Sequence, residues 1–202
     1  MEEKEMTEHE GLLIIQQMIA KAKAEQSDDG KGWIVWGWVL FSASILTFFN
    51  LKFQWFPNFF FWNLFGAFTI LFLLYNTIRY FFSPKKVKVK TYTTELFAKL
   101  NIGFFVFLFF IIIAINLGVG PAKGFALLIA LYAFWVLIYG TALNFKPSII
   151  AAFIMWAIGL GCLFINNFQW IMLLHALAVL CGYIIPGHLA NREFNKLQKQ
   201  NV

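Results

Sequence analysis

The amino-acid sequence predicts an all-α polytopic transmembrane bundle of six spans, preceded by a short N-terminal amphipathic cytoplasmic helix. Three observations lead to this fold class. Of the 202 residues, 60% are hydrophobic and only 13% are charged, whereas soluble domains have about 25% charged residues. Six apolar runs follow one another along the chain, and nearly all Lys and Arg residues fall in every second connection between them. A chain of this length holds one membrane domain and no second globular domain.

Residues 1–31 are a polar head in which we expect one helix. Thr7 and Glu10 have the spacing of a capping box directly before an apolar run. Apolar side chains then recur at helical spacing over residues 12–22. This run is much shorter than the ~20 residues that a membrane span needs. The pattern therefore predicts an amphipathic helix on the cytoplasmic membrane surface or packed beneath the bundle.

The six-span domain is expected over residues 32–187. Each apolar run has roughly the length that crosses a ~30 Å hydrocarbon core. The runs are continuous rather than alternating, and backbone inside a bilayer must form its hydrogen bonds within its own segment, so each run is predicted to be a helix. Pro186 and Gly187 are expected to end the sixth helix, which leaves residues 188–202 as a basic cytoplasmic tail. The predicted spans are residues 33–49, 59–75, 102–119, 125–143, 148–165 and 170–185.

The distribution of basic residues predicts the orientation. With six spans, only Lys52 and Lys123 fall on one side of the membrane. Cytoplasmic connections carry an excess of Lys and Arg, so the other side, with both termini, is predicted to be cytoplasmic. The basic residues on that side are Lys4, Lys21, Lys23, Lys31, Arg79, Lys85, Lys86, Lys88, Lys90, Lys99, Lys146, Arg192, Lys196 and Lys199.

Three polar side chains in the predicted spans are candidate functional groups. His175 is titratable and lies well inside the sixth span, where such residues often serve function. The alternative, which we favour, is a neutral histidine that bonds to a neighbouring helix. Asn63 and Asn116 have the same two interpretations, interhelical hydrogen bonding or a place along a pore or substrate path.

The loop after the second span contains a lysine cluster, Lys85, Lys86, Lys88 and Lys90. It has the charge to contact anionic lipid headgroups, at about 1 kcal/mol for each residue. The simpler interpretation is that it only fixes the orientation of the chain. No nucleic-acid reading motif accompanies the charge, so nucleic acid is not an expected partner.

The sequence lacks the patterns that most enzymes use. It has no Gly-rich phosphate loop, no metal-ligand spacing of the HExxH type and no nucleophile–base pair within the spans. It also has no carboxylate inside a predicted span, a group that ion-coupled transporters usually need. We therefore expect no enzymatic activity, no cofactor and no metal site.

The order of several motifs is similar to that of a known family. Trp36-Gly37-Trp38 begins the first span, and an Asn-Phe-Lys-Pro turn at residues 144–147 precedes the fifth. Ile185-Pro186-Gly187-His188-Leu189, followed by Asn191, ends the sixth. These features resemble a family of uncharacterised small multi-span proteins from Bacteroidetes-type bacteria. The resemblance implies a bacterial inner (cytoplasmic) membrane location and implies no activity.

Two functions remain open at the level of sequence. The first is a non-enzymatic accessory or regulatory bundle in the lipid bilayer, which contacts a protein partner or a second copy through its helices or its cytoplasmic face. The alternative is a transporter or channel for an uncharged or hydrophobic small molecule. In that case Asn63, Asn116 and His175 would line the path.

Overall fold

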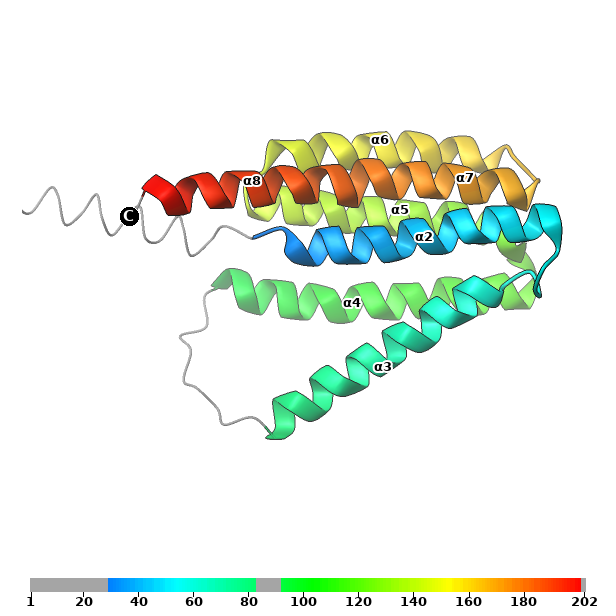
Figure 1. The fold of residues 1–202 in the computed structure, drawn as a ribbon, viewed down its shortest axis with the longest axis horizontal. Helices are drawn as coiled ribbons and strands as arrows, with labels where there is room; N and C mark the ends of the chain where they lie inside the picture. The colour runs from blue at the N-terminus through cyan, green and yellow to red at the C-terminus, as the bar shows by residue number, and fades with distance from the viewer. Residues whose placement is uncertain (1–28, 83–91, 201–202) are drawn as a thin grey trace, which may run out of the picture.

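The structure, a computed structural model, describes residues 29–82 and 92–200 (Figure 1). Every regular element in these two ranges is a helix, which confirms the all-α class. The helix expected over residues 12–22 and the lysine cluster at residues 85–90 lie outside the described residues, so neither expectation is tested.

The described chain forms seven α-helices, one kinked segment between two of them and one π-helical turn. Five helical stretches are long and apolar enough to cross a membrane, and they indicate a membrane protein. The α-helices are α2 (Lys31–Phe53), α3 (Phe60–Phe82), α4 (Tyr92–Ala114), α5 (Gly120–Ala142), α6 (Lys146–Leu163), α7 (Phe168–Val179) and α8 (Ile185–Gln200). The segment η1 (Ile115–Val119) is kinked at Gly118, and η2 (Leu180–Ile184) is a π-helical turn.

The longest apolar stretch, Leu96–Ala142, has 47 residues. A straight helix of that length would measure ~70 Å, more than twice the hydrocarbon core. The stretch is interrupted at Gly118, with φ 127°, and at Gly120, with φ 76°. These are left-handed conformations that glycine adopts at little cost. The chain reverses there, and α4 and α5 pack against each other (Figure 1).

The last helical stretch corrects one expectation from the sequence. Pro186 and Gly187 do not end the helix, because α7, η2 and α8 continue as one rod to Gln200 (Figure 1). The π-helical turn explains how the rod tolerates the proline. The backbone N–H of Ile185 bonds to the carbonyl of Leu180, five residues earlier. This wider turn relieves the clash between a proline ring and the preceding turn.

The packed core lies between α2, α5, α6 and α7. Its largest fully buried apolar side chains are Ile129, Met155, Ile171 and Met172. By contrast, α3 exposes most of its described Phe, Leu and Ile side chains, and α4 exposes about half of its own, as expected for surfaces that face lipid. Figure 1 shows that α3 diverges from α4 along its length.

Two glycines let α2 approach the α7–η2–α8 rod closely. A Cβ atom on Gly37 would lie 2.9 Å from Cγ1 of Ile184. A Cβ atom on Gly187 would lie 3.0 Å from Cγ1 of Ile34. Small residues allow such backbone contact between helices in lipid. The contact fixes the start of α2 against the start of α8.

Candidate functional sites at His175 and along α8

α2 contributes a row of buried polar side chains to the bundle. Ser44, Thr47 and Asn50 have no exposed surface, and their spacing places them on one side of the helix. The hydroxyls of Ser44 and Thr47 donate to the carbonyls of Leu40 and Ala43, at 2.8 and 2.7 Å. A hydroxyl that bonds four residues back satisfies its proton within its own helix.

His175 on α7 faces this row and is fully buried. Its Nδ1 lies 2.8 Å from Oγ of Ser44. Oγ of Ser44 is thus within hydrogen-bond distance of both the Leu40 carbonyl and Nδ1 of His175. Either atom can be the donor in the bond between Ser44 and Nδ1, because the roles of the two ring nitrogens depend on the tautomer of His175. Among the described residues, Nε2 is the buried side-chain nitrogen that lacks a hydrogen-bond partner.

Three aromatic rings pack around the imidazole. The ring centroids of Trp62, Phe125 and Tyr132 lie 5.3, 5.7 and 5.9 Å from that of His175, and each ring is close to perpendicular to it. Nε1 of Trp62 donates to Sδ of Met172 at 3.3 Å, which attaches α3 to α7. His175 is thus a meeting point of α2, α3, α5 and α7.

The other two candidates from the sequence lie in a different environment. Asn63 and Asn116 are exposed, whereas His175 is buried. The Asn116 amide donates to the carbonyl of Ile112 in its own helix, at 2.7 Å. The structure therefore does not enclose these three side chains in one site. Sequence reasoning missed Ser44 and Thr47, whose signal was a pair of small hydroxyl residues three apart in an apolar run.

Asn50 closes the turn between α2 and α3. Its amide nitrogen donates to the carbonyls of Phe56 and Pro57, both at 3.1 Å. Its amide oxygen accepts from the backbone N–H of Phe56 at 2.8 Å. These three bonds satisfy a buried amide and hold the start of α3 beside α2. Asn50 therefore has a structural role.

The second candidate site is one side of α8, which we call the basic face. Its residues recur every three or four positions, so they lie on one side of the helix. They line an open hollow of about 370 Å³. The basic face consists of His188, Asn191, Arg192, Asn195, Lys196 and Lys199.

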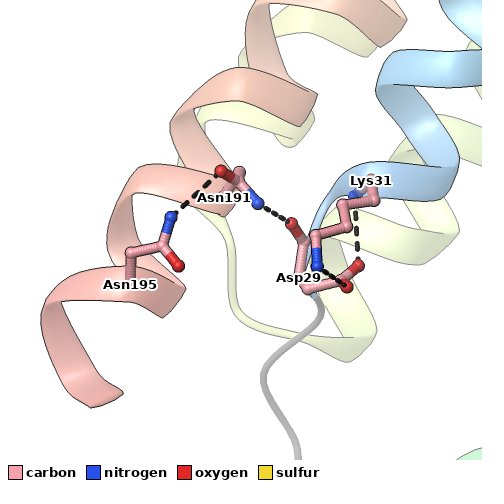
Figure 2. Close-up of polar contacts among 4 residues, drawn as sticks. All are labelled: Asp29, Lys31, Asn191 and Asn195. Atoms are coloured by element: carbon pink, nitrogen blue, oxygen red, sulfur yellow. Dashed lines mark hydrogen bonds and ion pairs between the residues drawn. The ribbon is translucent and has the colours of Figure 1, made fainter. Parts of the chain in front are cut away.

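Asn191 joins the basic face to the start of α2 (Figure 2). Its amide nitrogen donates to the backbone carbonyl of Asp29 at 2.7 Å, and its amide oxygen accepts from Asn195 at 3.1 Å. Lys31 pairs with the Asp29 carboxylate at 3.3 Å, an exposed ion pair that adds little stability. α8 is therefore held by α2 where it leaves the bundle.

Among the described residues, no three His, Cys, Asp or Glu side chains gather in a way that could hold a metal ion. Comparisons of the chain with protein-family models, with curated proteins and with solved structures found no match. The two sites above are therefore the basis for proposing a function.

Proposed function

We propose that the chain crosses a bacterial inner membrane six times, with both termini in the cytoplasm. The reversal at Gly118 and Gly120 supports two separate crossings within Leu96–Ala142. The described basic residues support the orientation. Lys52 near the end of α2 and Lys123 near the start of α5 are at one end of the bundle. At or near the other end are Lys31, Arg79, Lys99, Lys146, Arg192, Lys196 and Lys199.

In that membrane the protein acts as a non-enzymatic accessory or regulatory bundle that binds an acidic protein partner through α8. The observation that supports this function is the continuation of α8 out of the bundle (Figure 1). On its basic face Arg192, Lys196 and Lys199 are exposed. From His188 to Lys199 the helix rises ~16 Å, and a headgroup layer is only about 5–7 Å thick. The outer half of the basic face, Asn195, Lys196 and Lys199, thus reaches past the lipid.

A rigid helix suits this role for two physical reasons. The bond from Asn191 to Asp29 and the close contact at Gly187 fix α8 before a partner arrives, so little conformational entropy is lost on binding. Exposed lysines also steer an acidic partner and speed its association. Lys196 and Lys199 are both exposed.

The experiment compares co-purification from mild detergent for three forms of the full chain. We expect Lys196→Glu with Lys199→Glu to lose an acidic partner that the unchanged protein retains. Lys146→Glu reverses an exposed charge at the same end of the bundle and should retain the partner. A partner that binds all three forms equally, or the absence of any specific partner, would overturn the proposal.

A second candidate function, a transporter or channel for an uncharged small molecule, is favoured by Nε2 of His175. An unpaired ring nitrogen inside a membrane bundle can form a hydrogen bond with a hydroxyl or amide of such a compound. Native mass spectrometry tests this idea. A small molecule that co-purifies with the protein should be lost in His175→Leu and kept in Thr47→Val. Equal retention in both variants, or no bound compound, removes this candidate.

A further inference from the structure

The lipid-facing side of α7 continues directly into the basic face of α8. Leu173, Leu177 and Ile185 are exposed by 38%, 46% and 48%. In a regular α-helix, residues eight apart are ~80° out of line, at 100° per residue. The π-helical turn at η2 accommodates one extra residue, so Ile185 comes back into line with Leu177. Residues three or four apart then continue this line through His188 and Arg192.

The exposed apolar residues indicate how deep each side chain along this line lies in the membrane. Leu189, exposed by 41%, is the last large apolar side chain that α8 exposes. It marks the inner edge of the hydrocarbon. Arg192 is three residues further along, ~4.5 Å at 1.5 Å per residue, which is the level of lipid phosphates. Lys199 is another ~10 Å out, beyond the headgroup layer of about 5–7 Å.

We propose that an anionic glycerophospholipid of the cytoplasmic leaflet binds along this line. One acyl chain lies against Leu173, Leu177 and Ile185, and the phosphate lies in the hollow beside His188 and Arg192. The arginine fork offers two parallel N–H donors to a phosphate. Within the hollow, the amide of Asn191 is already engaged with Asp29 and Asn195. Arg192 is therefore the principal ligand of the phosphate.

The choice of a lipid follows from where the hollow lies on α8. The inner half of the hollow, at His188, Asn191 and Arg192, lies in line with the exposed apolar side chains of α7 and Ile185. One lipid molecule can therefore place an acyl chain on these side chains and its headgroup in the hollow. The charge of the inner half is positive, and the only carboxylate of α8 belongs to Glu193, outside the hollow. A zwitterionic lipid offers the same acyl chains but has no net charge for Arg192.

The test measures lipids retained by the purified full chain in native mass spectrometry, with phosphatidylglycerol and phosphatidylcholine supplied in equal amounts. The unchanged protein should retain one phosphatidylglycerol in preference to phosphatidylcholine. Arg192→Gln should weaken that retention about fivefold, the factor that corresponds to about 1 kcal/mol for one basic residue. Arg192→Lys keeps the charge without the fork and should fall between the two.

Lys199→Gln is the matched control because it removes the same charge from the same face ~10 Å further from the membrane. Its phosphatidylglycerol retention should equal that of the unchanged protein. Equal losses in Arg192→Gln and Lys199→Gln would show general charge attraction and overturn the site, as would an unchanged protein that retains both lipids equally. The result is independent of the proposed partner, which depends on Lys196 and Lys199 and not on Arg192.

Discussion

At the residue scale, the two ring nitrogens of His175 have different surroundings. Nδ1 bonds to Ser44, and Nε2 has no partner. The sequence identified His175 as the titratable group inside a span, and its interhelical bond was the interpretation we favoured. The identity of the partner could not be predicted. Ser44 is 131 residues away in the chain, and a single sequence does not specify which helix faces which.

The bond between Ser44 and His175 makes a specific prediction about stability. Ser44→Ala removes the partner of Nδ1 and leaves a buried ring nitrogen unsatisfied, so it should cost about 1 kcal/mol of the free energy of unfolding. Thr47→Val is the matched control, because it removes a buried hydroxyl that bonds only within its own helix. It should cost less than Ser44→Ala. Denaturant titration in detergent micelles measures both.

A double-mutant cycle isolates the interaction itself. In the His175→Leu background neither ring nitrogen remains, so Ser44→Ala should then cost close to nothing. The two substitutions should therefore be clearly non-additive. Additive costs would show that Ser44 does not stabilise the protein through His175.

At the element scale, the apolar runs predicted where the helices are but not where they end. The third apolar run begins at residue 102, whereas α4 begins at Tyr92. Polar residues can continue a helix beyond its apolar part, and a hydropathy pattern does not show where such an extension begins. The predicted helix end at Pro186 was wrong, because the helix continues through the proline. A π-helical turn accommodates proline, and it has no pattern in the sequence that we could recognise beforehand.

The contact between α2 and the α7–η2–α8 rod predicts the effect of added volume. Gly37→Leu places a side chain against Ile184 and Tyr183, and such overpacking typically costs about 1–3 kcal/mol. The unfolding transition of this variant should shift to clearly milder conditions. Gly161→Leu is the control, because a Cβ at Gly161 on α6 would have no atom within 4 Å apart from its chain neighbours and the nearby backbone of its own helix. Equal effects of both substitutions would contradict the close packing at Gly37.

At the scale of the whole molecule, composition predicted a membrane protein, and the apolar helices of the structure indicate the same. The number of crossings stays a prediction, and it depends on a local feature. If the chain did not reverse between α4 and α5, every later helix would have the opposite orientation. The reversal involves positive φ angles at Gly118 and Gly120. The sequence predicted this boundary as the gap between the apolar runs at residues 102–119 and 125–143.

The central claim is that the chain crosses the membrane six times and presents α8 to the cytoplasm. Cysteine accessibility tests it most directly, in a full chain with Cys162 and Cys181 replaced by Ala. Leu117→Cys probes the turn between α4 and α5, where the side chain is 82% exposed, and Gln198→Cys probes α8.

A membrane-impermeant maleimide added to intact cells with a permeabilised outer membrane should label position 117 and not position 198. Position 198 should react only after the inner membrane is opened. Labelling of position 198 in intact cells would place α8 outside the cytoplasm. Protection of position 117 would show that the turn between α4 and α5 does not reach the outer side. Either result would contradict the six-span arrangement.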